Sequence, residues 1–259
     1  MKTITTLFAL LLFTSHVCAE VQFRQVEYRD GEQKLSGYIA WDDSIKGKRP
    51  GVLVVHEWWG LNDYSKKRAR MLAEEGYVAF AADMYGDGKV TTHADDAKGW
   101  MSQITANEAA WQKRARLGLE QLKQNKLVDD DKLAAIGYCF GGATVMQLAY
   151  AGTDLDGVVS FHGSLPPATP DQASNIKTRV LVAHGDADSF IPAERITAFK
   201  KALSDAGVDW EMNIYSGAKH GFTNPGAGDF GMDALAYNEK ADKRSWQKMK
   251  SFFDEIFSK

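Results

Sequence analysis

A cysteine lies between glycines in the segment GYCFGG, residues 137–142. The segment follows the apolar run KLAAI and precedes ATVMQLAYA, which has a helical composition. G-x-C-x-G at such a boundary is the spacing of a nucleophile elbow, a sharp strand-to-helix turn that projects its central residue into a cleft. Gly137 and Gly141 fit because any side chain there would clash across the turn. We predict Cys139 at a helix N-terminus that favours an anion, with the Phe140 amide facing a developing oxyanion.

A cysteine nucleophile needs a base, and the base needs an orienting group. His220 lies in SGAKHGFTNPGAG, after the last strand-like run, and is the predicted base. His184 is expected to pack or cap a strand end, and His162 to border the cleft. Asp186 and Asp188 in HGDADSFIP both remain candidates for the orienting acid. The chain order would then be nucleophile, acid and base, as in α/β-hydrolases.

Other interpretations of Cys139 compete with the nucleophile. Free cysteine is often a buried, inert small hydrophobe. An exposed thiol could instead serve a redox-responsive or ligand-binding protein through sulfenic acid or a mixed disulfide. The chain has only one further cysteine, Cys18. If Cys18 is removed with a leader, one thiol supports neither an internal disulfide nor a cysteine-based metal site. Hydrolysis by a cysteine, a histidine and an acid requires no metal and no cofactor, and we predict none.

The first 19 residues have the pattern of a signal peptide. Lys2 precedes an apolar run from residue 7 to residue 13, and VCA precedes Glu20. We predict cleavage after Ala19, export to the periplasm, and a single domain over residues 20–259. The apolar run is too short to span a bilayer, so no stable membrane insertion is expected. The exported chain would carry 30 basic and 34 acidic residues, a balance that argues against nucleic acid as a partner.

The rest of the chain alternates strand-like and helical patterns. GVLVVH, YVAFAAD, LDGVVSFHG, TRVLVAHGD and WEMNIY are strand-like, and helical spacing covers residues 64–75, 95–124, 193–206 and 237–257. Alternation of this kind predicts a mostly parallel sheet with helices on both faces and no large cap domain. Ligands bind such sheets at the carboxyl ends of the strands, where VVHEWWG, IGYCFGG, LVAHGDADSF and NIYSGAKHG carry their polar residues.

With these motifs in place, the sequence resembles the dienelactone hydrolases, a cysteine-using branch of the α/β-hydrolase fold. HEWWGLN, DMYG, GYCFGG, GDADSFIP and KHGF carry the resemblance, which covers residues 22–257. It implies Cys139 as nucleophile, His220 as base and Asp188 rather than Asp186 as acid. It also implies that Glu57 orients the resting thiol and that the Trp58 amide is a second oxyanion donor.

The resemblance implies a hydrolase of small esters or lactones that works through a covalent thioester. The oligomeric state stays open, with a monomer as the default expectation. Trp59, His162, Phe222 and Asn224 are the expected substrate-lining residues. Family members bind a substrate carboxylate with an arginine a few residues beyond the catalytic histidine. Here that position reads FTN, with Asn224 and no arginine, so the reaction type transfers better than the substrate.

Overall fold

The computed structural model describes residues 21–258, and the leader predicted for residues 1–19 lies outside them. The strands are β1 (Val21–Asp30), β2 (Gln33–Asp42), β3 (Arg49–Val55), β4 (Val78–Ala82), β5 (Val128–Tyr138), β6 (Gly157–Phe161), β7 (Arg179–Gly185) and β8 (Trp210–Tyr215). The helices are α1 (Asp63–Glu74), α2 (Ala94–Thr105), α3 (Glu108–Lys123), α4 (Phe140–Tyr150), α5 (Pro170–Asn175), α6 (Ala193–Asp205) and α7 (Glu239–Phe257), with a 3-10 turn η1 (Ala227–Phe230).

One eight-stranded sheet has the order β1-β2-β4-β3-β5-β6-β7-β8. β1 pairs antiparallel with β2, and β2 pairs antiparallel with β4, whereas the strands from β4 to β8 are parallel neighbours. The parallel strands therefore bring their carboxyl ends to one edge of the sheet. This arrangement confirms the predicted α/β-hydrolase fold with a mostly parallel sheet.

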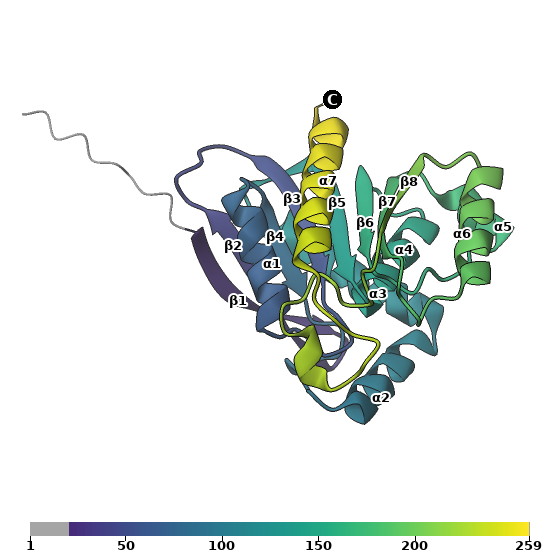
Figure 1. Ribbon diagram of the computed structural model, residues 1–259. Coiled ribbons are helices and arrows are strands. Elements are labelled where there is room, and N and C mark those ends of the chain that lie inside the picture. The colour runs from purple at the N-terminus through teal and green to yellow at the C-terminus, as the bar shows by residue number, and fades with distance from the viewer. Residues whose placement is uncertain (1–20, 259) are drawn as a thin grey trace, which may run out of the picture.

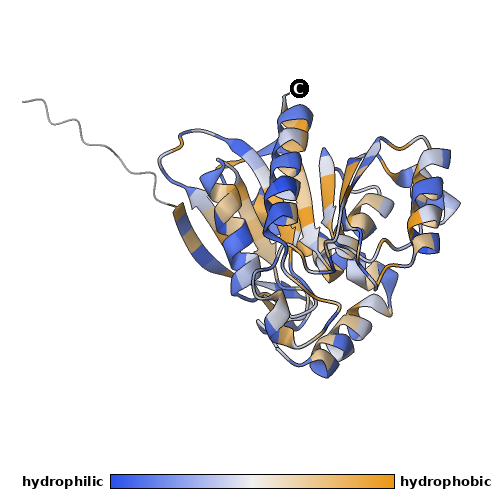
Figure 2. Cartoon of the chain, in the orientation of Figure 1, coloured by the Kyte–Doolittle hydropathy of each residue, from blue (hydrophilic) through white to orange (hydrophobic). Residues whose placement is uncertain are grey.

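Helices cover both faces of the sheet. In Figure 1, α1 and α7 lie in front of the strands, while α3 and α4 lie behind them. The front core includes Leu72, Phe252 and Phe253, and the rear core includes Leu119 and Val145. Figure 2 shows apolar central strands and polar outer helical surfaces, as expected for strands buried on both faces.

The helical spacing of residues 95–124 is confirmed as two helices, because Asn107 caps the second one by accepting from the Ala110 amide. Other elements go beyond the sequence expectation. β1 is a full ten-residue strand, and α5 occupies part of the proline-rich loop. Among residues 21–258, no helix combines the length and apolar composition needed to cross a membrane.

Candidate active site

The strand-to-helix turn has the geometry of a nucleophile elbow. β5 ends at Tyr138, and Cys139 precedes α4 with φ 54° and ψ −113°. A Cβ on Gly137 would lie 1.9 Å from the Gly141 carbonyl oxygen, and a Cβ on Gly141 would lie 2.1 Å from the Val55 carbonyl oxygen. Both positions therefore require glycine. Strained conformations such as that of Cys139 cost about 1–3 kcal/mol and concentrate at functional sites.

A buried histidine and aspartate meet this turn from two other strand ends. His220 Nδ1 donates to Asp188 Oδ2 over 2.8 Å. His220 also forms a side-chain hydrogen bond with Cys139. Asp188 is buried, and its Oδ1 accepts from the Phe190 amide at 3.0 Å. Asp186 is exposed, so of the two candidate acids only Asp188 contacts His220.

The charges around His220 favour its protonated form. Burial alone would lower its pKa, but the negative charge of Cys139 and the hydrogen bonds to Asp188 and Cys139 outweigh burial and raise the pKa to about 10. Once the thiol has ionised, an imidazolium and a thiolate therefore stabilise each other. The arrangement can deliver a nucleophilic sulfur together with a nearby proton donor.

The loop after β3 lies close to the elbow. Trp58 lines the same pocket as Cys139. The Trp58 carbonyl accepts from the Tyr85 hydroxyl at 3.0 Å. Asp83 in turn fixes the loop of Tyr85 by accepting from the amides of Tyr85 and Gly86 at 3.0 and 2.8 Å. Tyr85 therefore positions the segment that carries the expected second oxyanion donor.

Glu57 and Asn224 form a buried pair beside His220. Asn224 Nδ2 donates to Glu57 Oε2 at 2.7 Å, and both residues are at most 5% exposed. Burial raises the Glu57 pKa to about 7, although the Asn224 hydrogen bond and the charges of His220 and Arg68 oppose that rise. Asn224 therefore holds the Glu57 side chain in place.

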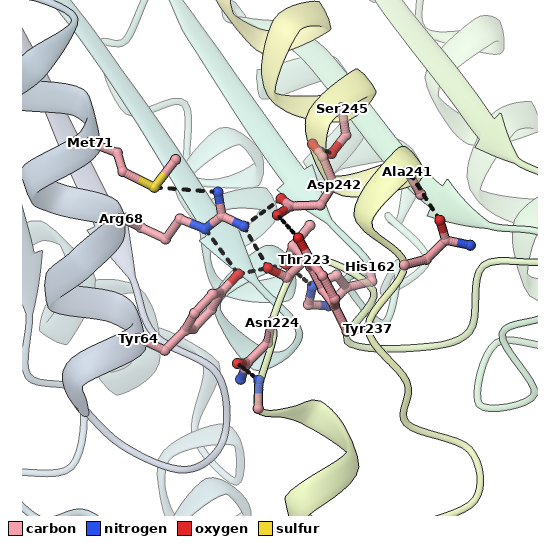
Figure 3. A network of polar contacts seen from close by, with 12 residues as sticks. Tyr64, Arg68, Met71, His162, Thr223, Asn224, Tyr237, Ala241, Asp242 and Ser245 are labelled. Carbon is pink, nitrogen blue, oxygen red and sulfur yellow. Dashed lines mark hydrogen bonds and ion pairs between the residues drawn. The ribbon is translucent and has the colours of Figure 1, made fainter.

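His56 and His162 occupy structural positions at strand ends. His56 Nε2 accepts from the Met84 amide at 3.2 Å, which ties the end of β3 to the loop after β4. His162 is fully buried behind the elbow, where its Nδ1 accepts from the Cys139 amide at 3.1 Å. Figure 3 shows the polar network that reaches His162 from α1 and α7.

A small apolar pocket of about 160 Å³ lies above Cys139 and His220. The other residues that line it are Trp58, Met101, Ser164, Phe190, Ile191, Arg195 and Leu235. The expected lining residues Trp59, His162, Phe222 and Asn224 are instead buried and absent from the lining. They lie in the shell that supports the site.

Sequence reasoning missed several of the lining residues. Met101 and Leu235 lie in no catalytic motif, and packing alone places them in the pocket lining. The HGDADSFIP motif did signal the neighbourhood of Phe190, whose ring lies 5.0 Å from that of His220. Residues 21–258 contain no group of three or more histidine, cysteine or acidic side chains arranged to hold a metal ion.

Comparisons with known proteins agree with this geometry. Residues 35–257 match the model of the dienelactone hydrolase family. Protein usf of Aquifex pyrophilus is 32% identical over 244 residues, covering 91% of this chain and 99% of that protein. An Aquifex aeolicus protein, provisionally named a carboxymethylenebutenolidase, is 30% identical over 89% of this chain and 97% of its own.

Among solved structures, a dienelactone hydrolase-like promiscuous phosphotriesterase from metagenomic libraries superimposes with a TM-score of 0.89. It is 40% identical and covers 92% of this chain and 99% of its own. The match of the family model to most of the chain, together with the Cys139 elbow and the His220–Asp188 pair, identifies this protein as a member of the dienelactone hydrolase family of ester and lactone hydrolases.

Proposed function

We propose that the protein hydrolyses small esters or lactones through Cys139, His220 and Asp188. The observation that carries the proposal is the position of His220, hydrogen-bonded to both Asp188 and Cys139 beneath an apolar pocket. The pocket volume of about 160 Å³ is below that of drug-sized ligand sites and favours a small acyl group.

The reaction would proceed in two halves. The Cys139 thiolate attacks the carbonyl carbon and forms a C–S bond, and the amides of Phe140 and Trp58 stabilise the oxyanion. Each oxyanion donor contributes about 3–4 kcal/mol in comparable sites. The C–O bond then breaks, and protonated His220 gives its proton to the leaving alkoxide. In a lactone this alcohol remains attached to the acyl chain.

Water completes the cycle. His220, oriented by Asp188, takes a proton from the water as its oxygen attacks the thioester carbon. The C–S bond breaks, Cys139 leaves as the thiolate, and the carboxylic acid departs. Glu57, held by Asn224, lies beside His220 and would supply local charge rather than a bond to the substrate.

A panel of short-chain aryl esters and enol lactones tests the proposal. The wild-type protein should turn over at least one member, and Cys139→Ala should abolish that turnover. Asp188→Asn and Asp186→Asn form a matched pair, because only Asp188 is buried against His220. We expect a large loss of kcat in the first and little change in the second. Equal turnover by wild type and Cys139→Ala would refute the proposal.

A second candidate activity is the hydrolysis of phosphotriesters. The 40% identical structural neighbour is described as a promiscuous phosphotriesterase, and the pocket over Cys139 is apolar apart from Arg195 and Ser164. An uncharged triester could enter such a pocket. The thiolate would form a P–S bond as the P–O bond to the aryl group breaks, and protonated His220 would give its proton to the leaving aryloxide. Water, losing a proton to His220, would then cleave the P–S bond and release the phosphodiester and the Cys139 thiolate. Release of 4-nitrophenol from diethyl 4-nitrophenyl phosphate, absent in Cys139→Ala, would support this activity.

The redox alternative is less favoured, because a redox thiol needs no general base with its own orienting acid. Mass spectrometry of Cys139 after mild peroxide treatment tests it, and a thiol that stays reduced would count against it.

Export through residues 1–19 and a monomeric state stay predictions from the sequence. Peptide mapping of the secreted chain and light scattering would examine them.

A further inference from the structure

A chain of buried polar groups leads from helix α1 to the amide of the nucleophile. Arg68 Nε donates to the Tyr64 hydroxyl at 3.2 Å, and that hydroxyl lies 2.6 Å from Thr223 Oγ1. Thr223 Oγ1 lies 2.8 Å from His162 Nε2, and His162 Nδ1 lies 3.1 Å from the Cys139 amide nitrogen. Figure 3 shows the first part of this chain, from Arg68 through Tyr64 and Thr223 to His162.

The direction of these hydrogen bonds fixes the tautomer of His162. An amide N–H can only donate, so Nδ1 must be the unprotonated nitrogen that accepts from Cys139. Nε2 then carries the proton and donates it to Thr223 Oγ1. Burial, the charge of His220 and the charge of Arg68 all lower the His162 pKa, which keeps the ring neutral.

The other end of the chain is anchored. Arg68 is 3% exposed, and its Nη2 donates to the Thr223 carbonyl at 2.6 Å and contacts Asp242 of α7. Thr223 is therefore held by both its backbone and its hydroxyl. A Thr223 hydroxyl in a fixed place gives His162 Nε2 a fixed acceptor.

The hydrogen bond to His162 reaches the elbow at its most strained point. Cys139 has φ 54° and His162 has φ 40°, both in the left-handed region that side chains seldom adopt. The Cys139 amide is shared between the Phe161 carbonyl at 3.0 Å and His162 Nδ1 at 3.1 Å. Two acceptors on one amide fix the peptide plane that aims the Cys139 sulfur at His220.

We propose that His162 is a positioning residue, which holds the amide of Cys139 through Nδ1 while Thr223 accepts from Nε2 and fixes the orientation of the ring. Its effect on turnover rests on the proposed ester hydrolysis by Cys139. Its effect on the thiol does not, because alkylation of Cys139 by iodoacetamide requires no substrate. The two measurements separate failure of this inference from failure of the proposed function.

Two isosteric substitutions divide the roles of the two ring nitrogens. In His162→Asn, the amide oxygen takes the place of Nδ1 and keeps an acceptor for the Cys139 amide. In His162→Gln, the terminal amide takes the place of Nε2 and reaches Thr223, but the acceptor for Cys139 is lost. Asparagine also tolerates positive φ. His184→Gln is the matched control, since His184 is another buried strand-end histidine, and its Nδ1 has no partner among residues 21–258.

We expect His162→Gln to lower kcat by about 100-fold, the cost of misplacing a reacting atom by about 1 Å, with KM little changed. The rate of Cys139 alkylation should fall as well. His162→Asn should restore most of both rates, and His184→Gln should match the wild type. Equal rates in His162→Gln and wild type would overturn the inference, as would equal losses in the glutamine and asparagine variants.

Substitutions of Thr223 test the proposal independently, because they leave the His162 side chain unchanged. Thr223→Val removes the hydroxyl at nearly constant shape, whereas Thr223→Ser keeps it. We expect the valine variant to lower kcat and to shift the ¹⁵N signal of His162 Nε2, which loses its acceptor, while Nδ1 stays unprotonated opposite the Cys139 amide. The serine variant should retain the wild-type signal and kcat. An unchanged Nε2 signal and kcat in Thr223→Val would contradict the role of Thr223 in holding the ring.

Discussion

The buried carboxyl of Glu57 should make the stability of the fold depend on pH in a defined direction. Its pKa rises from 4.5 to about 7 on folding, because burial penalises the charged form. Below pH 4.5 the carboxyl is neutral in both the folded and the unfolded chain. Between 4.5 and about 7 the unfolded chain releases this proton while the folded chain keeps it, so the free energy of unfolding falls as pH rises.

The size of this effect follows from the interval between the two pKa values. The two pKa values differ by about 2.5 units, and each unit corresponds to about 1.4 kcal/mol. Above the pKa of the folded state, the buried charge therefore lowers the free energy of unfolding by about 3 kcal/mol. Glu57→Gln removes the titration and keeps an oxygen to accept from Asn224 Nδ2. Relative to wild type, the variant should gain roughly 2–3 kcal/mol of stability between about pH 5 and about pH 8.

Urea unfolding of both proteins at four or five pH values measures this difference directly. Glu74→Gln is the control, because Glu74 is exposed on α1 and its substitution changes the net charge by the same amount. We expect no comparable pH-dependent gain in that control. If the free energies of unfolding of Glu57→Gln and wild type differ by the same amount at every pH, the raised pKa of the buried Glu57 carboxyl is refuted.

Three further substitutions probe the site. Gly141→Ala should prevent stable folding, measured by circular dichroism and soluble yield, because its Cβ would lie 2.1 Å from the Val55 carbonyl oxygen. Tyr85→Phe removes the hydroxyl that donates to the Trp58 carbonyl at 3.0 Å, so kcat should fall by about tenfold or more while the melting temperature changes little. Arg195→Gln removes the only charged side chain other than His220 and Cys139 in the pocket lining among residues 21–258. It should raise KM for esters with an anionic acyl group and leave KM for neutral esters unchanged.

The fold and the grouping of Cys139 and His220 at the strand ends could be predicted from the sequence, because both depend largely on local signals. Continuous apolar runs predict buried parallel strands, and a contact across the turn at Cys139 requires glycine at position 137. Gly141 is required instead by the close approach of Val55 in the neighbouring strand β3. The choice between Asp186 and Asp188 was different. Local pattern left it open, and only the resemblance and then the burial of Asp188 decided it.

The composition of the pocket could not be predicted in the same way. Met101 comes from α2, Phe190 and Arg195 from the region that follows β7, and Leu235 from the loop before α7. These residues come together over Cys139 because the long connecting segments fold back onto the strand ends. No regular spacing in the sequence indicates how those segments fold. Conversely, polar residues near the motifs, such as His162 and Asn224, suggested a substrate contact but bind other parts of the protein.

The loop after β8 links these observations. Within five residues it supplies His220 to Cys139, Thr223 to His162 and Asn224 to Glu57. Backbone hydrogen bonds secure the loop, from the Ala236 amide to the His220 carbonyl at 3.2 Å and from the Asn238 amide to the Phe222 carbonyl at 3.0 Å. Because one short segment orients His220, His162 and Glu57, its conformation couples three parts of the candidate site. A change of substrate preference is therefore more readily achieved in the pocket lining, for example at Met101, than in this loop.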